Sequence, residues 1–572
     1  MAIRTEIAYI DFMIQGLLKH RMAAHWPGVN FDILIPDDPA LGDYSTNIAF
    51  TLAQQQHQSP ADAAERVIQF VKDDAVLGPV FEKVVFAAPG FVNFFLKASF
   101  LQQHLADIYR KRSAYGSSPI NKGKTVMVEY TDPNPFKQFH IGHLMSNAIG
   151  ETIARLYEAT GAKVIRVNWQ GDAGLHIAMA VWGMQKGHDY LGPAYTFGAR
   201  AYQDNPEAKK EIEAINKKLY DRSDSKLNML YQKGREGSLR HFETLYQRLG
   251  TKFTHYFFES EMAPRGVEIV RQHPDVFEAS EGATIFRGEK YGLHTRVFIN
   301  AQGLPTYEAK ELGLNQEKFR LYKPDLSLIV TGNEITEYFK VLLQAMQLIM
   351  PEVASRTRHV PHGMLRLPSG KMSSRTGEVV PAEQFIDEVK TYVDEKLAQR
   401  EGLSTKEREG IRESVALAAI RYTMLRQGIG RDITFDVKTA VAFEGDSGPY
   451  LQYTHARLSA VLTKAGVLAR LSRYVYRPSA HTLNENLELR LIKHMLDFSS
   501  VIVRSTQLHA PNALASYLHG LATLANRYYE SIHILSDEQT ARKAARLVLV
   551  ETIVAILKRG LDLLGIRALK RI

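Results

Sequence analysis

The sequence predicts an α/β multidomain protein with an α+β N-terminal domain, a central domain built on a parallel sheet, and an all-α C-terminal bundle. Three observations support this prediction. The chain has 572 residues, which is enough for three to four domains. Strand and helix patterns alternate in the middle of the chain. From about Phe385 onward the pattern is almost entirely helical.

The composition is that of a globular protein, with 45% hydrophobic and 23% charged residues. These values exclude a collagen-like, coiled-coil or wholly disordered chain. The chain has no cysteine, which excludes disulfides, thiolate nucleophiles and iron–sulfur clusters and fits a reducing compartment. Glu6 and Asp11 interrupt the first apolar stretch, and Glu551 interrupts the longest late one. We therefore expect neither a signal peptide nor a membrane span.

The net charge of +9 is concentrated at one end of the chain. Residues 451–572 contain 17 Lys and Arg residues against 8 Asp and Glu residues, so the preceding part of the chain is neutral overall. A concentrated positive field favours a polyanionic partner such as RNA. A basic surface that serves only solubility is an equally good explanation of this feature alone.

The first 115 residues alternate helical patterns with short strands, and an apolar strand-like stretch at 84–96 precedes a turn-rich segment. A β-α-β unit follows, with a strand at 125–130, a loop, a helix from about 143 to 160 that ends at Gly161, and a strand at 163–167. Residues 186–250 have the polar, helix-forming composition of a surface insertion, with a helix at 205–218.

The patterns beyond the insertion predict a second half of the sheet. Strands at 296–300 and 326–330 flank a helix at 307–318, and another helix follows at about 335–350. Leucines at helical spacing and the apolar stretch 548–564 then predict a helix bundle at the end of the chain.

The loop after the strand at 125–130 carries the richest motif, which ends in His140, Ile141, Gly142 and His143. It opens a helix at the carboxyl end of a parallel strand, where open α/β sheets bind ligands. The free N–H groups of a helix start favour a phosphate, and two imidazoles add donors to phosphoryl oxygens. Gly142 leaves room for a flat base against the backbone. The alternatives are an ordinary helix start or a pair of metal ligands.

A second motif lies at 368–377, where two glycines bracket a loop that contains Lys371 and Arg375. It is not a Walker A loop, because Met372 follows the Gly-Lys pair and Leu365 stands where the first glycine belongs. By itself it could be a solvated surface loop. Together with the first motif it indicates an enzyme that closes a loop over a nucleoside triphosphate.

These motifs resemble the two signatures of class I aminoacyl-tRNA synthetases, since residues 140–143 match the complete HIGH motif and residues 371–375 resemble the KMSKS loop. The surroundings resemble arginyl-tRNA synthetases in particular. The similar segments are VEYTDPNPFKQFHIGH and its continuation to 174, FEGDSGPYLQYTHAR at 443–457, LGDYSTN at 41–47, APGFVNFFL at 88–96, and RGLDLLGI near the end. The resemblance covers essentially the whole chain in order.

The resemblance implies a Rossmann-like catalytic domain at 116–384, with the insertion at about 186–250 and the KMSKS-like loop at 370–377. It also implies a tRNA-binding N-terminal domain at 1–115, a helical connection at 385–450 and an anticodon-binding domain at 451–572. The implied reaction joins L-arginine to its tRNA through an arginyl-adenylate, with ATP as substrate, Mg²⁺ as cofactor, and AMP and pyrophosphate as products. The expected enzyme is a cytoplasmic monomer with no resident metal ligands.

The resemblance also assigns site residues. Those implied for catalysis and ATP binding are Lys137, His140, Gly142, His143, Lys371, Met372, Ser373 and Arg375. Those implied for the amino acid are Glu129, Asn134, His140, Tyr307 and Glu311. Those implied for tRNA are Asn526, Tyr528 and Tyr529. Glu311 could otherwise be a solvated helix charge, and we expect only one of the two tyrosines to face RNA, since aromatic residues at helical spacing are often core residues.

An arginine site should bring acids together near the HIGH loop, because a guanidinium keeps its charge and prefers carboxylate acceptors. Two positions depart from the family pattern. Ser374 stands where the KMSKS loop has its second lysine. Lys137, just before the HIGH motif, resembles a family lysine that compensates for this change. Glu311 stands where most relatives have Asp. Glu334, in a loop near the expected pocket, has no assigned role. A non-catalytic tRNA-binding paralogue and another class I synthetase are the competing hypotheses.

Overall fold

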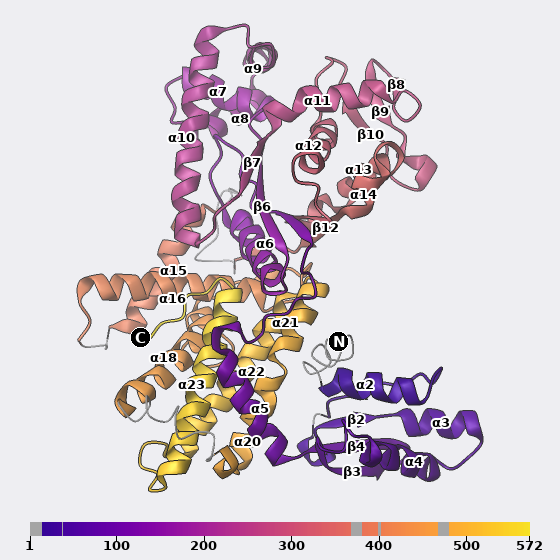
Figure 1. Ribbon diagram of the computed structural model, residues 1–572. Coiled ribbons are helices and arrows are strands. Elements are labelled where there is room, and N and C mark those ends of the chain that lie inside the picture. Colours follow the sequence, from indigo (N-terminus) through magenta and orange to yellow (C-terminus); the bar gives the residue numbers. More distant parts are fainter. Residues whose placement is uncertain (1–13, 37, 368–379, 399–401, 467–479) are drawn as a thin grey trace.

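The structure is a computed structural model that describes residues 14–36, 38–367, 380–398, 402–466 and 480–572 (Figure 1). Its N-terminal part has an antiparallel sheet of order β1-β2-β4-β3, covered by helices. The strands are β1 (Ile33–Leu34), β2 (Tyr44–Thr46), β3 (Phe81–Ala87) and β4 (Phe91–Leu96), and the helices are α2 (Ile14–His25), α3 (Ile48–Gln56) and α4 (Pro60–Asp73). The single strand-like stretch predicted at 84–96 is therefore a hairpin, because the chain reverses at Pro89 and Gly90.

The centre of the molecule is a five-stranded parallel sheet of order β12-β11-β5-β6-β7. Its strands are β5 (Thr125–Glu129), β6 (Lys163–Gln170), β7 (His255–Phe258), β11 (Leu326–Gly332) and β12 (Thr357–His362). The helices that connect or cover them are α6 (Ile141–Ala159), α7 (Leu175–Gln185), α11 (Glu259–Gln272), α12 (Tyr307–Tyr322), α13 (Thr336–Ile349) and α14 (Pro351–Arg356). The predicted β-α-β unit is thus β5-α6-β6, at the centre of the sheet.

One strand predicted for this sheet belongs elsewhere. β10 (Arg296–Ile299) pairs with β9 (Ala283–Phe286), which pairs with β8 (Glu278–Ser280), in a separate antiparallel sheet. A four-residue strand pattern gives no information on its hydrogen-bonding partner, and here the short connection at 287–295 returns the chain antiparallel to β9. The prediction that both 296–300 and 326–330 extend the parallel sheet is wrong for the first of them.

The insertion between β6 and β7 is helical, as its composition predicts. It forms α8 (Pro193–Asp204), α9 (Pro206–Asp221) and α10 (Ser225–Leu249). Asn205 and Asp224 begin α9 and α10, because their side chains accept hydrogen bonds from two backbone N–H groups each. Together with α7 these helices enclose a small core of their own at the top of Figure 1.

The last third of the chain is helical and carries one helix from the N-terminal region. Its helices are α15 (Ala382–Leu397), α16 (Thr405–Leu425), α17 (Val437–Ala440), α18 (Gly448–Ala465), α20 (Asn486–Leu496), α21 (Phe498–Gln507), α22 (Pro511–Ser531) and α23 (Thr540–Leu563). Helix α5 (Ala98–Lys111) leaves the N-terminal sheet and packs against α20 and α23 (Figure 1). Within the described ranges, no helix is both long and apolar enough to cross a bilayer.

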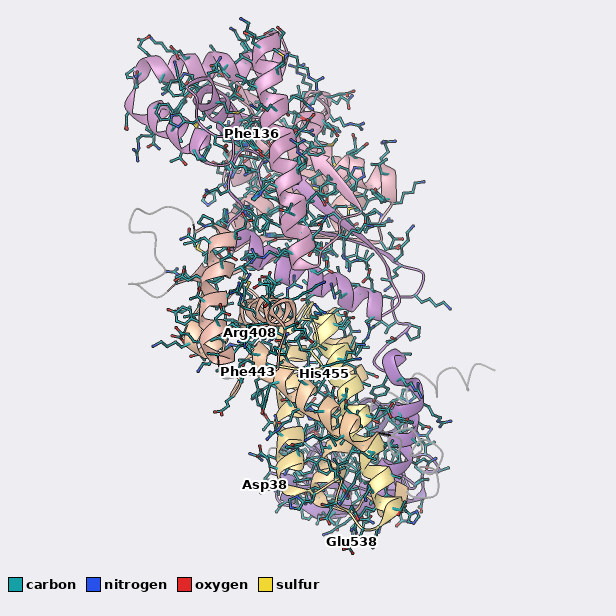
Figure 2. All side chains as sticks on the ribbon, turned by 90° about the vertical axis from the view of Figure 1, so that its left-hand side faces the viewer. Asp38, Phe136, Arg408, Phe443, His455 and Glu538 are labelled. Atoms are coloured by element: carbon teal, nitrogen blue, oxygen red, sulfur yellow. The ribbon has the colours of Figure 1, made fainter. Side chains whose placement is uncertain are left out.

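A buried arginine joins α6 and α16 to the end of the chain. Arg421 of α16 is 6% exposed, and its guanidinium donates to Asn147 Oδ1 of α6 at 2.9 Å, to the Leu249 carbonyl at 3.2 Å and to the Gly565 carbonyl at 2.8 Å. Within the bundle, His455 of α18, labelled near the middle of Figure 2, is bonded to the Leu569 carbonyl at 2.8 Å and so holds the end of the chain against α18. The hydrogen bonds of Arg421 therefore connect the sheet domain to the C-terminal bundle.

Candidate active site

The order of the parallel sheet places a ligand site beside β5. The chain runs outward from β5 in one direction through β6 and β7, and in the other through β11 and β12. The connections therefore leave the sheet in opposite directions between β5 and β11, which is the topological switch point where open α/β sheets bind ligands. The loop at 130–140 and the start of α6 lie at this point.

The loop is held in an unusual backbone conformation by contacts with several elements. Thr131, Asp132 and Phe136 have positive φ values of 81°, 46° and 68°, which cost free energy for residues with a side chain. Asp132 Oδ1 accepts from the Trp169 N–H at 2.7 Å, and the Phe136 N–H donates to Ser238 Oγ at 2.9 Å. The Phe136 ring is fully buried in the core of the insertion, high in Figure 2. The insertion therefore helps to shape this loop.

His140 and His143 form the N-terminal cap of α6. His140 Nδ1 accepts from the Gly142 N–H at 3.1 Å, and His143 Nδ1 accepts from the His140 N–H at 3.1 Å. The two rings stack with their centroids 3.7 Å apart. Because both Nδ1 atoms are acceptors, the ring proton of each neutral histidine lies on Nε2. A Cβ on residue 142 would lie 2.9 Å from the His140 ring, so this stacked arrangement requires glycine.

Both histidines are neutral at physiological pH. Burial, with a contribution from the charge of Lys137, lowers the pKa of His140 to about 4. Burial and the neighbouring His140 lower the pKa of His143 well below its usual value. Each ring is therefore a neutral Nε2–H donor and carries no full positive charge.

Three carboxyl groups and one ammonium group lie close together near this cap. Glu129 ends β5, Asp132 follows in the loop, and Glu311 projects from α12, while Lys318 of the same helix lies 2.5 Å from Glu129 Oε2. Glu129, Glu311 and Lys318 are all at most 5% exposed. The cluster therefore holds more carboxyl groups than cationic groups.

The pKa values reflect this excess of acid. Burial and the charge of Glu129 raise the pKa of Glu311 to about 8. The same two causes raise the pKa of Asp132 well above its usual value. The free site therefore retains protons that an incoming cation would displace. The acids expected near the HIGH loop are present in this arrangement.

A second buried ion pair lies beside the first. Lys310 Nζ of α12 is 2.6 Å from Glu259 Oε2 at the start of α11, and it donates to the Ala173 carbonyl at 3.1 Å. Burial alone would lower the pKa of Lys310, but Glu259 raises it. Asn134 lies beside this ion pair. A Cβ added at Gly171 would be 2.2 Å from Asn134 Oδ1 and 3.2 Å from Glu259 Oε1, so both side chains lie close to the Gly171 backbone. The pair connects α12 to α11 and to the loop after β6.

Two further predicted residues border the site. Tyr307, at the first turn of α12, is 52% exposed, and the Lys310 ammonium lies 5.0 Å from its ring centroid. The Lys137 ammonium lies 4.5 Å from the ring centroid of Tyr195 on α8. Glu334 is exposed, and its carboxylate folds back over Gly332 at the end of β11.

The KMSKS-like loop falls outside the described residues, and with it Lys371, Met372, Ser373, Ser374 and Arg375. The chain on its C-terminal side lies against the start of α6. The Ile141 N–H donates to the Val380 carbonyl at 3.2 Å, and the Ala382 N–H donates to the Phe139 carbonyl at 2.8 Å. Residues 380–382, which follow this loop in sequence, thus lie beside the first motif at the start of α6.

The residues predicted for tRNA differ in accessibility. Tyr528 is fully buried, and Asn526 is 8% exposed with its Nδ2 donating to Thr454 Oγ1 at 2.8 Å. Both lie inside the bundle because α22 packs on two sides: Asn526 faces α18, and Tyr528 faces Glu488 of α20. Tyr529 is half-buried under the Arg457 guanidinium, 4.2 Å from its ring centroid. Of the three, Tyr529 alone presents an aromatic ring near the surface.

Sequence reasoning missed four residues of the site, namely Asp132, Glu259, Lys310 and Lys318. Lys318 lies seven residues after Glu311, on the same helical face, so helical spacing could have found it. Nothing in the sequence pairs Glu259 with Lys310, because their contact joins two helices whose packing the pattern does not specify.

Comparison with known proteins connects this geometry to one family. A family model described as "tRNA synthetases class I (R), catalytic domain" matches residues 104–437. Models for "Arginyl tRNA synthetase N terminal domain" and "DALR anticodon binding domain" match residues 13–96 and 451–572. The chain is 30% identical to an arginine–tRNA ligase of Treponema pallidum over 92% of each chain, and 28% identical to one of Clostridium acetobutylicum over 93% and 94%.

Solved structures show the same fold. The arginyl-tRNA synthetase of Thermus thermophilus matches with a TM-score of 0.75 at 23% identity, over 98% of this chain and all of that one. The arginyl-tRNA synthetase of Plasmodium falciparum matches with a TM-score of 0.78 at 19% identity, over 98% of each chain. The order and extent of the three parts are therefore shared along the whole chain.

Proposed function

The chain belongs to the class I arginyl-tRNA synthetase family and so carries out the ATP-dependent attachment of arginine to tRNA; we propose that its acidic cluster holds the arginine and its histidine cap holds ATP. The observation that carries this assignment is the excess of acid around Lys318, formed by the buried Glu129 and Glu311 and the half-buried Asp132. Arginine brings two cationic groups, an α-ammonium and a guanidinium, and a site with surplus carboxyl groups can accept both.

In the first step, a carboxylate oxygen of arginine attacks the α-phosphorus of ATP, and the bond to the bridging oxygen of pyrophosphate breaks. The Nε2–H groups of His140 and His143 donate to phosphoryl oxygens on which negative charge grows. We assign Lys137, Lys371 and Arg375 to the departing pyrophosphate, with Met372 and Ser373 in the same loop. In the second step, a hydroxyl of the 3′-terminal ribose of tRNA attacks the arginyl carbonyl, and AMP leaves.

The remaining assignments concern the surroundings of this reaction. We propose that Mg²⁺ accompanies ATP, because phosphate oxygens are the hard ligands that this ion prefers. We propose Tyr529, beside Arg457, as the residue on which a tRNA base stacks. We also propose a monomer that works in the cytoplasm, a compartment whose reducing conditions fit a chain without cysteine. Sedimentation of the purified protein tests the first part of that statement.

The test of the function is aminoacylation of total tRNA with each labelled amino acid in turn. We expect arginine alone to be attached, and only in the presence of ATP and magnesium. Attachment of a different amino acid would make the protein another class I synthetase. Binding of tRNA without any attachment would make it a non-catalytic paralogue.

Arginine binding is expected to release close to one proton at about pH 7. Glu311 has a pKa of about 8 in the free site, so it is mostly protonated at pH 7, and a bound guanidinium favours its ionised form. Arginine affinity should therefore rise as the pH increases toward about 8 and then level off. Calorimetric titration in two buffers of different ionisation enthalpy measures the proton release, and a release of zero at pH 7 would remove Glu311 from the contact.

Removing one phosphate donor is expected to lower the rate of adenylate formation by roughly tenfold to 100-fold, the loss of one charge-assisted hydrogen bond. The variants are Lys371→Ala and His140→Asn, since Asn retains an N-cap acceptor for α6 but removes the imidazole. Arginine-dependent pyrophosphate exchange with tRNA present measures the rate. Lys406→Ala, an exposed lysine at the start of α16, is the control. Wild-type exchange in either variant would remove that residue from the mechanism.

A further inference from the structure

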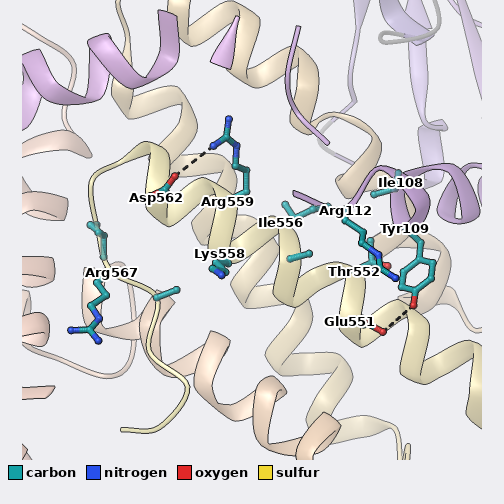
Figure 3. Close-up of a pocket in the computed structure, with 13 residues that line it drawn as sticks. Ile108, Tyr109, Arg112, Glu551, Thr552, Ile556, Lys558, Arg559, Asp562 and Arg567 are labelled. Atoms are coloured by element: carbon teal, nitrogen blue, oxygen red, sulfur yellow. Dashed lines mark hydrogen bonds and ion pairs between the residues drawn. The ribbon is translucent and has the colours of Figure 1, made fainter. Parts of the chain in front are cut away.

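A large cavity lies away from the acidic cluster, where α5 meets α23 and the C-terminal tail. Its volume is about 640 Å³, within the usual range for small-molecule sites. Its walls come from the end of α5 with Arg112, the C-terminal half of α23, and residues 566–568 (Figure 3). Asp562 of this wall accepts from Arg155 of α6, so the cavity borders the N-terminal region, the sheet domain and the bundle together.

The charges at the cavity are unbalanced. Four cationic side chains line it, against two carboxylates: Arg112, Lys558, Arg559 and Arg567 against Glu551 and Asp562. Both carboxylates have partners, since Tyr109 donates to Glu551 at 3.1 Å and Arg559 lies 3.5 Å from Asp562. Among the described residues, no carboxylate lies within 4.0 Å of Arg112, Lys558 or Arg567. These three cationic side chains are therefore available to bind an anionic ligand.

The other walls suit a flat apolar group. Ile108, Ile556, Ile566 and two alanines supply aliphatic surface, and Tyr109 supplies an aromatic ring. Figure 3 shows Arg112 and Tyr109 at one end of the cavity, with Lys558 and Arg567 toward the other. A ligand that fits both the apolar and the cationic walls has a flat ring and a doubly charged anionic group within one molecule.

We propose that this cavity binds a phosphorylated nucleoside, with the base against the isoleucines and Tyr109 and the phosphate on Lys558 and Arg567. The same chemistry can be supplied by a free mononucleotide or by one nucleotide of a bound tRNA. The site is separate from the acidic cluster and does not depend on the assignment of catalytic residues there. Because it borders three parts of the chain, an occupant would stabilise their relative arrangement.

The test uses the full-length protein and uridine 5′-monophosphate as the probe. Lys558 and Arg567 are both exposed, so Lys558→Gln/Arg567→Gln removes two charges with little effect on folding. Lys570→Gln is the matched control, an exposed lysine three residues further along the tail that does not line the cavity. Ala555→Phe, which fills the cavity and leaves its charges in place, is a second variant. Thermal unfolding checks that each variant is folded.

We expect calorimetry to show probe binding to wild type that weakens at least tenfold in the double variant and in Ala555→Phe, and that is unchanged in Lys570→Gln. Affinity for unacylated tRNA then identifies the source. A parallel loss of tRNA affinity assigns the cavity to a nucleotide of the tRNA, and unchanged tRNA affinity assigns it to a free nucleotide. Equal probe binding by wild type and the double variant, or no binding at millimolar probe with unchanged tRNA affinity, would overturn the proposal.

Discussion

Glu311→Gln is expected to lower kcat/KM for arginine by roughly 1000-fold, about 4 kcal/mol. The carboxylate is buried, and removing one partner of a buried charged contact costs about 2–5 kcal/mol because the other partner loses its compensation. Glutamine has the same shape but cannot carry the negative charge that the guanidinium needs. The measurement is arginine-dependent aminoacylation across a range of arginine concentrations, and Glu311→Asp should retain most of the activity.

The same variant is expected to be at least as stable as wild type at pH 8. In the folded free protein Glu311 keeps its proton up to about pH 8, whereas an unfolded chain loses it near pH 4.5. Wild-type stability therefore falls as the pH rises between these values, and glutamine removes this loss. Glu317→Gln is the control, since Glu317 is similarly buried on the same helix but pairs with Arg265 and Arg320. A variant that is unstable, or that charges tRNA at the wild-type rate, would contradict this role.

Lys318→Met is expected to destabilise the protein by about 3–5 kcal/mol, because it leaves the buried Glu129 carboxylate without the ammonium with which it pairs. The loss should be larger at pH 8 than at pH 6, since the unpaired acids must bind protons to remain buried. Urea unfolding at the two pH values measures it. Arg320→Met is the control, because this arginine on the same helix is largely exposed.

The double variant Glu129→Gln/Lys318→Met tests whether the loss comes from the unpaired charge. Replacing both partners of a buried ion pair by neutral groups is often nearly neutral for stability. We therefore expect the double variant to recover most of the stability that Lys318→Met loses. A double variant as unstable as the single one, or a loss below about 1 kcal/mol in Lys318→Met, would show that the ion pair is not the cause.

The fold could be predicted from the sequence where the pattern is local. The β-α-β unit around α6, the helical insertion and the final bundle follow from hydrophobic periods and turn residues, and the structure has all three. Pairing partners could not be predicted in this way. β10 has the pattern of a sheet strand, but it pairs with β9 in a separate sheet, and α5 follows the N-terminal sheet in sequence yet packs in the C-terminal bundle.

The sequence by itself determined the family and the helix start at His140 to His143, because both depend on short motifs of neighbouring residues. Only the tertiary structure decided which charges meet. It paired Glu129 with Lys318 and Lys310 with Glu259, and it buried Tyr528 while leaving Tyr529 near the surface. Ionisation and accessibility depend on distance and burial, which are set by the packing of segments far apart in the chain.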